Sequence, residues 1–117
     1  MAFTNTGKHA MLDHVASLAT HVRLLDEVGD EIEWSAASQD KEITWAAAGA
    51  SEDGEIAASS QPVFDVPGGK TVGGVAFINN TGATEYARDT FAEGDRETYS
   101  NDGTYTVSTA KLIITDS

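Results

Sequence analysis

The first apolar pattern along the chain has the period of an α-helix. Four apolar residues recur at i, i+4, i+7 and i+11 and share one helical face: Met11, Val15, Leu18 and Val22. Leu12, Ala16 and Ala19 widen this face. No proline or glycine interrupts residues 8–19, and Thr6 is placed to cap the first turn. The pattern predicts one helix over residues 6–20. Because so short a helix is marginal by itself in water, we expect its apolar face to lie against another surface.

After the helix, apolar and polar residues alternate, which is the period of a β-strand. Turn residues such as Gly29, Gly54 and Asn101 divide this part of the chain into short segments. Alternation is weaker at 85–88 and 97–99. Since the helix precedes the strands instead of alternating with them, βαβ units are disfavoured. The pattern predicts a mainly β fold, a jelly-roll-like β-sandwich of about eight short antiparallel strands with one N-terminal helix.

The strand pattern also predicts the core and one special backbone position. Ile32 and Trp34 alternate with polar neighbours and predict a strand there. Gly73 and Gly74 interrupt an apolar run, which indicates a bulge or a close backbone approach. The expected core is drawn from both faces of the strands: Ile43, Trp45, Phe64, Val66, Val75, Phe77, Leu112 and Ile114. No repeat or linker divides the chain, so we interpret residues 1–117 as a single β-sandwich domain, with strands over 21–117.

Composition changes this picture mainly through charge. The 117 residues include 19 Asp and Glu but only 7 Lys and Arg, which gives a formal net charge of −12. Binding to nucleic acid or to an anionic membrane requires basic surface, so both partner classes are disfavoured. Self-repulsion between carboxylates costs stability in dilute buffer and is screened in molar salt. The acid excess favours a halophilic host, with an ordinary acidic protein as the alternative.

Two absences in the sequence bear on where the protein is made. There is no cysteine, which excludes disulfide and thiol chemistry. Residues 1–9 contain no apolar stretch of the signal-peptide kind, and no run approaches the ~18 apolar residues that span a bilayer. We therefore expect synthesis in the host cytoplasm without a signal peptide.

No set of reactive side chains has the spacing of a catalytic or metal site. His9, His14 and His21 are separated by 5 and 7 residues, whereas two metal-binding imidazoles on one helix face need i, i+3 or i, i+4 spacing. A triad of Ser17, His14 and Asp13 is disfavoured because adjacent helical residues point about 100° apart. The sequence thus predicts no catalytic residue, no metal and no cofactor, and the protein is not expected to be an enzyme.

Some apolar residues have no evident place in the core and are candidate interface residues: Phe3, Met11, Val15, Leu18 and Trp34. Apolar groups of this kind, when exposed, tend to mark a partner surface. Trp34 has a second interpretation, because an indole ring can stack on a sugar. Separately, residues 79–81 match the pattern N-x-[ST], which makes Asn79 a candidate glycosylation site.

Several segments follow one another in a recognisable order. Residues 10–13 (AMLD) and 18–22 (LATHV) precede 43–48 (ITWAAA), and residues 64–77 (FDVPGGKTVGGVAF) come later. This order is similar to that of small virion proteins of tailed phages, which are described as tail-fibre or minor structural proteins. The resemblance covers the chain from the helix to about residue 107. It implies a β-sandwich that assembles as a symmetric oligomer on a virus particle.

The function that these observations favour is a non-enzymatic structural protein of the virion, on the exterior of a tailed virus. A capsid decoration or turret subunit fits best, because the chain makes a compact knob and not a long shaft. The expected partners are copies of itself, with a trimer favoured, and the major capsid or other virion proteins. Two alternatives remain open: a tail-fibre or baseplate component, and a small carbohydrate-binding β-sandwich that uses Trp34.

Overall fold

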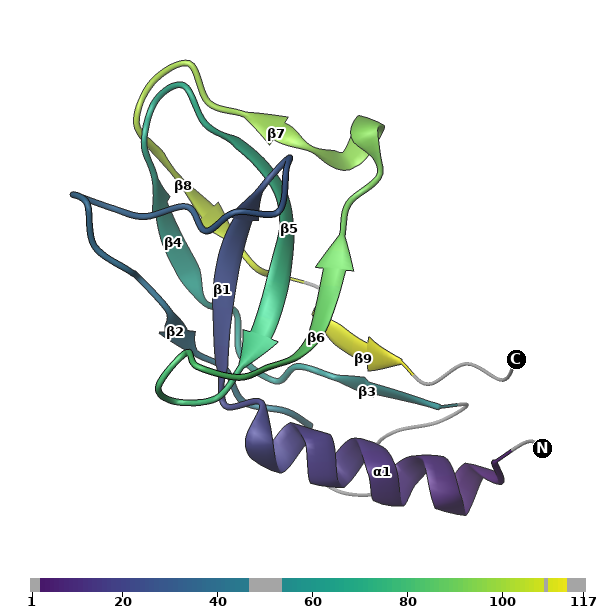
Figure 1. The fold of residues 1–117 in the computed structure, drawn as a ribbon. Helices are drawn as coiled ribbons and strands as arrows, with labels where there is room; N and C mark the ends of the chain where they lie inside the picture. Colours follow the sequence, from purple (N-terminus) through teal and green to yellow (C-terminus); the bar gives the residue numbers. More distant parts are fainter. Residues whose placement is uncertain (1–2, 47–53, 109, 114–117) are drawn as a thin grey trace.

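A computed structural model of the chain describes residues 3–46, 54–108 and 110–113. One α-helix is followed by short strands and a single 3₁₀ turn in these residues (Figure 1). In chain order the elements are α1 (Asn5–Leu18), β1 (His21–Asp26), β2 (Lys41–Glu42), β3 (Glu55–Ala57), β4 (Val63–Val66), β5 (Thr71–Ile78), β6 (Glu85–Thr90), η1 (Glu93–Asp95), β7 (Glu97–Thr98), β8 (Gly103–Thr106) and β9 (Lys111–Ile113). The mainly β fold with one N-terminal helix is therefore confirmed.

Helix α1 begins at Asn5, one residue before the predicted range, and its N-cap lies two residues before the predicted one. The N-cap is Thr4 and not Thr6, and the Thr4 hydroxyl accepts a hydrogen bond from the Gly7 N–H at 3.1 Å. The helix ends at Leu18, where the Ala19 N–H donates to the Val15 carbonyl. Among the described residues, no helix is both long enough and apolar enough to cross a bilayer.

The buried face of α1 is one side of the predicted apolar face. Leu12 and Ala19 are fully buried, and Val15 and Ala16 pack against the core beside them, whereas Leu18 is 39% exposed. The predicted face is confirmed at Leu12, Val15, Ala16 and Ala19. It is wrong at Val22, which lies beyond the end of the helix and belongs to β1. Helix α1 lies against β3 and β9.

The larger sheet is antiparallel and built around β5. Its order is β2-β1-β5-β6, and β7 pairs with β5 beyond the end of β6. Residues 72–78 are buried throughout, as expected for a strand covered on both faces. Gly73 and Gly74 meet the backbones of Asp26–Glu27 and Asp89, where a Cβ atom would overlap. The register shift in β1 between Leu25 and Asp26 lies beside them, so the predicted close approach is confirmed.

The second layer is one kinked antiparallel ribbon. Residues 55–66 run alongside residues 103–108 and 110–113, first as the pair β3–β9 and then as the pair β4–β8. Between the two pairs, the Ala58 N–H donates to the Ala110 carbonyl and the Val107 N–H donates to the Pro62 carbonyl, each at 2.9 Å. These bonds keep the two short sheets in one continuous layer.

The two layers are joined along one side by the chain that follows β2. The Ile43 N–H donates to the Thr20 carbonyl, and three residues later the Ala46 N–H donates to the Ala57 carbonyl. Trp45 forms an isolated bridge with Ala58 between these points. Because this segment pairs with the first layer at one end and with the second at the other, the sheets curl into a sandwich-like half-barrel (Figure 1).

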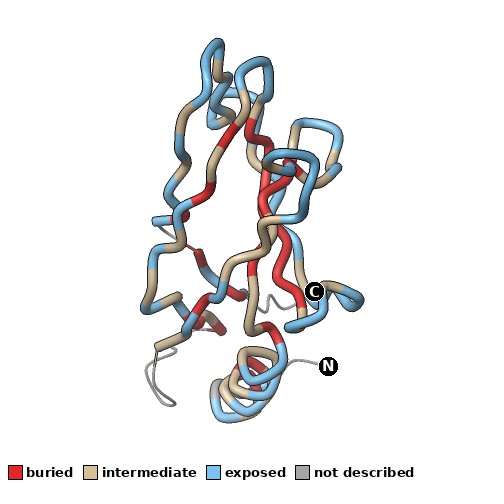
Figure 2. The backbone as a smooth tube through the Cα atoms, turned by 90° about the vertical axis from the view of Figure 1, so that its left-hand side faces the viewer, coloured by how far each residue is buried: buried red, intermediate tan, exposed pale blue. Residues whose placement is uncertain are grey.

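The core lies between these layers and is closed at one end by α1. Buried backbone runs through the central strands, whereas the loops and the outer side of the helix are exposed (Figure 2). The predicted core residues that are fully buried are Ile43, Phe64, Val66, Val75, Phe77 and Leu112. Trp45 packs against this core, with its ring edge-on to Phe77 at 5.3 Å between centroids. Ile114 lies outside the described residues.

The strand predicted around Ile32 and Trp34 is not formed. Glu31 makes one isolated bridge with Leu25, and Trp34 makes another with Ala37 across a tight turn. The two central residues of that turn, Ser35 and Ala36, have φ of 54° and 60°. Such left-handed backbone is unfavourable for residues other than glycine and ends the extended conformation at once. Ile32 is nevertheless fully buried, so the alternation marked a buried side chain and not a strand.

The outer face of the larger sheet carries a small apolar cluster covered by two arginines. Leu25, Ala76 and Ile78 form this cluster, and the register places Arg23 and Arg88 on either side of Ala76. Arg23 donates two hydrogen bonds to Asp40, at 2.9 and 2.8 Å. Arg88 likewise donates two hydrogen bonds to the Glu85 carboxylate. These hydrogen bonds are the main reason that the pKa values of both guanidinium groups are raised.

Candidate functional site

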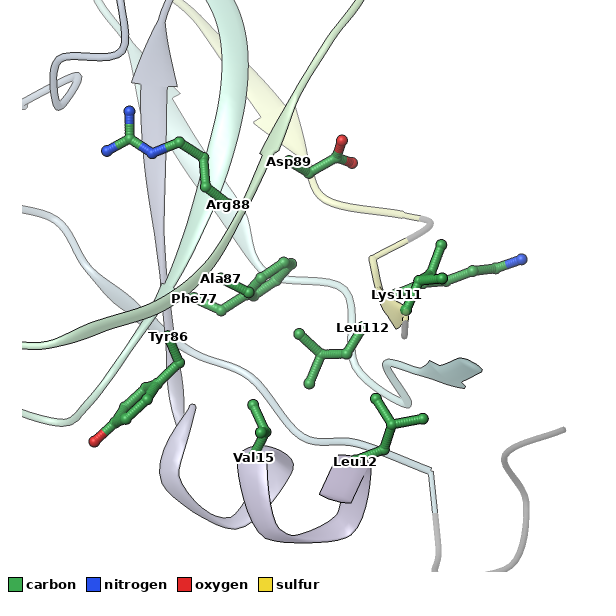
Figure 3. Close-up of a pocket in the computed structure, with 10 residues that line it drawn as sticks. Leu12, Val15, Phe77, Tyr86, Ala87, Arg88, Asp89, Lys111 and Leu112 are labelled. Atoms are coloured by element: carbon green, nitrogen blue, oxygen red, sulfur yellow. The ribbon is translucent and has the colours of Figure 1, made fainter. Parts of the chain in front are cut away.

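The side of the half-barrel opposite the Trp45 crossing is open. In the described part of the chain, β6 pairs with β5 alone and β9 pairs with β3 alone. We call the gap between these two strand edges the seam. A groove of about 440 Å³ lies in the seam above α1 (Figure 3). Its lining comes from four elements: Leu12, Val15, Phe77, Tyr86, Ala87, Arg88, Asp89, Lys111, Leu112 and Ile113.

The floor of the groove is apolar because three elements turn their core-facing side chains toward it. Leu12 comes from α1, Phe77 from β5 and Leu112 from β9, and each is at most 4% exposed. Val15 is half-buried and adds a second helix residue. Since these side chains belong to the core, the floor is rigid and preformed.

The rim of the groove combines exposed apolar groups with two opposite charges. Tyr86 on β6 is 37% exposed and Ile113 on β9 is 55% exposed. Asp89 lies on the β6 side and Lys111 on the β9 side, and both charged ends point away from the floor in Figure 3. Lys111 pairs with Glu55 at 3.5 Å, and both side chains are about half exposed. Such a pair is weak and can exchange partners at little cost.

A second hollow, of about 680 Å³ and more open to solvent, lies on the other side of Tyr86. It is lined by residues of the α1–β1 junction, of 42–44 and of the turn after β5: Ser17, Leu18, Thr20, His21, Glu42, Ile43, Thr44, Asn79, Asn80 and Tyr86. The Thr20 hydroxyl and His21 Nδ1 are 2.9 Å apart in its wall. Tyr86 therefore separates two depressions and is in contact with both.

The structure brings some of the sequence-predicted interface residues together and separates others. Val15 lines the groove and Leu18 lines the second hollow, with Tyr86 shared between them. Met11 is half-buried on α1. Phe3 is 47% exposed at the far end of the helix. Trp34 is half-buried in its tight turn and lines neither depression.

Asn79, the glycosylation candidate, is half-buried in the turn between β5 and β6. Its Oδ1 accepts hydrogen bonds from the Thr81 hydroxyl at 3.1 Å and from the Ala83 N–H at 3.0 Å. These bonds hold the turn closed and fix where β6 begins. Glycosylation of Asn79 stays a prediction.

The upper end of the seam is closed by aromatic packing. Phe91 and Tyr105 lie 6.4 Å apart between ring centroids, with their planes tilted by 33°. Burial raises the pKa of the Tyr105 hydroxyl, and the carboxylates of Glu97 and Asp89 raise it further. No described group of three His, Asp or Glu residues is arranged to hold a metal ion.

The residues that form the rim have no distinctive pattern in the sequence. Tyr86 and Asp89 belong to a segment whose alternation is weak, and Ile113 reads as an ordinary strand residue. The available signal was the high polarity of 85–90, which is typical of an edge strand.

Scans of protein-family models and searches of curated proteins and solved structures found no match to this chain.

Proposed function

We propose that this chain is a non-enzymatic structural protein that acts by assembly on the exterior of a tailed-virus particle, as a capsid decoration subunit. Its contacts are with copies of itself and with neighbouring virion proteins. The observation that carries the proposal is the apolar ridge of Val15, Leu18 and Tyr86 between two depressions. Exposed apolar side chains gathered beside a groove are typical of a protein-binding surface.

The charge of the chain supports assembly at this place. A net charge of −12 opposes contact between copies over most of the surface. The three side chains of the ridge are themselves uncharged: Tyr86 borders both depressions, Val15 lines the groove and Leu18 lines the second hollow. Molar salt would screen the remaining repulsion, so the proposal includes a halophilic host.

The first test is the mass of the protein in solution, by light scattering in dilute buffer and in molar salt. We expect a multiple of 12.3 kDa, favoured by salt. Leu18→Glu places a charge on the ridge and should abolish association, with its circular-dichroism melt unchanged. Ala10→Glu is the matched control, because Ala10 is an exposed residue of the same helix. A wild-type protein that remains monomeric in molar salt at millimolar concentration contradicts the proposal.

The second test is location on the particle. Immunogold labelling of particles purified from the virus that carries this gene should place the protein on the exterior of the head. Label confined to the tail would favour the tail-fibre or baseplate alternative. Particles without label would remove the virion assignment and leave only the assembly of the isolated protein.

A further inference from the structure

The second hollow differs from the groove in being polar and in holding side chains that the fold does not use. Three segments far apart in the sequence meet there: the α1–β1 junction, residues 42–44 and the turn after β5. Its volume of about 680 Å³ lies in the range of small-molecule sites. Because the hollow is also open to solvent, a hydrated ligand suits it better than an apolar one.

Tyr86 is presented to the hollow by an irregularity in the larger sheet. The register of β5 and β6 shifts between Phe77 and Ile78, and Tyr86 is the extra residue that this shift leaves without a partner on β5. Such a bulge re-aims a side chain and is common beside functional sites. The hydroxyl end of Tyr86 points away from Phe77 and the floor of the groove (Figure 3). The ring is 37% exposed and lines the hollow, so one aromatic surface is available to a ligand there.

Three polar groups of the hollow have no hydrogen-bond partner in the described part of the chain: the Glu42 carboxylate, the Asn80 amide and His21 Nε2. His21 and Glu42 are directly paired across β1 and β2, which puts their side chains on one face of the sheet. The other ring nitrogen of His21, Nδ1, lies 2.9 Å from the Thr20 hydroxyl, which leaves Nε2 for a ligand. Asn80 is exposed in the turn that Asn79 holds closed, so its position is fixed in advance.

The three groups match a ligand that carries hydroxyl groups. A carboxylate only accepts hydrogen bonds, an amide side chain donates and accepts, and a neutral imidazole nitrogen does one or the other according to its tautomer. A hydroxyl group satisfies all of them, because it both donates and accepts. An anion would be repelled by Glu42 and by the net charge of −12. An aromatic ring such as that of Tyr86 packs against C–H groups, and a sugar presents such groups on one face and hydroxyls at its rim.

We propose that the second hollow binds one pyranose unit of a neutral glycan. The C–H face of the sugar lies against the Tyr86 ring. Its hydroxyl groups form hydrogen bonds with Glu42, Asn80 and His21 Nε2. This assignment replaces Trp34, which lines neither depression, as the aromatic platform. Because Tyr86 also belongs to the ridge, a sugar and a second copy of the chain exclude each other at this ring. Binding is therefore measured on the unassembled protein in dilute buffer, and it does not depend on assembly.

Nuclear magnetic resonance of the isotope-labelled protein tests the site. The probes are the methyl glycosides of glucose, galactose, mannose and N-acetylglucosamine. At least one should shift the amide signals of residues 42–44 and 79–86 in a saturable titration. Tyr86→Ala should raise the dissociation constant about tenfold, whereas Tyr86→Phe keeps the ring and should leave it within about twofold. Glu42→Gln replaces a charged acceptor by a neutral one and should raise the constant about threefold.

Two matched controls lie outside the hollow. Phe3→Ala removes another exposed aromatic ring, and Glu33→Gln neutralises another exposed carboxylate. Both should leave the dissociation constant unchanged, and circular dichroism checks that every variant is folded. A Tyr86→Ala protein that binds like wild type overturns the proposal, as does a loss of binding in Trp34→Ala alone. The absence of any shift with all the glycosides at about 100 mM overturns it too. None of these results bears on assembly, which light scattering measures separately.

Discussion

On one side of the curled sheet the chain itself crosses from layer to layer, whereas on the other side two strand edges are left apart. The closed side is held by groups that satisfy one another. Trp45 Nε1 donates to the Ala19 carbonyl at 2.9 Å, and its ring meets Phe77. The floor of the seam is also apolar, but β6 and β9 each lack a second neighbour in the described part of the chain.

Gln39 extends the closed side along β4. Its Nε2 donates to the carbonyls of Asp65 and Ile32, and its Oε1 accepts from the Asp65 N–H at 3.0 Å. One side-chain amide thus occupies the free edge of β4 as a neighbouring strand would. Among the described residues, the edge of β4 is covered in this way, whereas the edges of β6 and β9 at the seam have no second strand. The open seam is therefore the place to look for intermolecular contact.

Removing the Trp45 ring should produce the largest change on the closed side. Trp45→Ala loses the contact with Phe77 and leaves a cavity between the layers, at a cost of about 3 kcal/mol in the free energy of unfolding. Val15→Ala, at the half-exposed wall of the seam, should cost about 1 kcal/mol. Urea denaturation measures both. Equal costs would show that the seam contributes as much to the fold of one chain as the closed side does.

Trp45→Phe separates the ring contact from the hydrogen bond. It keeps an aromatic ring near Phe77 and removes the donor to the Ala19 carbonyl. We expect a loss of about 1–2 kcal/mol, between wild type and Trp45→Ala. A loss as large as that of Trp45→Ala would assign the whole effect to the hydrogen bond.

Opening the β4 edge should have an intermediate effect. Gln39→Ala removes three hydrogen bonds, but water reaches the half-buried site, so we expect a loss of about 1–2 kcal/mol. Hydrogen exchange at the Asp65 amide should accelerate more than exchange at amides of β5. Gln39→Glu is the informative companion, because its carboxylate still accepts from Asp65 but faces two carbonyl oxygens. The Gln39→Glu variant should be less stable than Gln39→Ala at neutral pH. Its stability should rise again in acid, because the protonated carboxyl group can donate a hydrogen bond to one of these carbonyl oxygens.

The sequence predicts the inside of this protein better than its edges. Phe64, Phe77 and Leu112 were placed in the core because alternation reports which side chains face inward, and burial follows from that alone. Alternation carries no information on which strand has a neighbour. Ile32 shows the difference, since it is fully buried although its segment forms only isolated bridges.

Only part of the candidate site could be predicted from the sequence, for the same reason. Val15 and Leu18 were identified from helical spacing, but their companion Tyr86 comes from a strand about seventy residues away in sequence. Tyr86 lies near the two helix residues because the turn held by Asn79 returns β6 along β5, toward the end of α1. Long-range pairing of this kind depends on the whole sheet, and a local pattern does not encode it.

The smallest expected effect is a pH dependence at the closed upper end of the seam. Burial, with the charges of Glu97 and Asp89, raises the pKa of Tyr105 above its ordinary value of 10.0. Below pH 10 the phenol is protonated whether the chain is folded or unfolded, and it contributes no slope. As the pH rises past 10, the unfolded chain loses this proton first, so stability falls until the pKa of the folded state is passed.

Tyr105→Phe keeps the ring beside Phe91 and removes the ionisation, so its unfolding free energy should decline less between pH 9 and pH 11 than that of wild type. Urea titrations at these pH values measure the two slopes. Identical slopes would mean that the hydroxyl group is as well solvated in the folded protein as in the unfolded chain, and that the aromatic closure of the seam admits water.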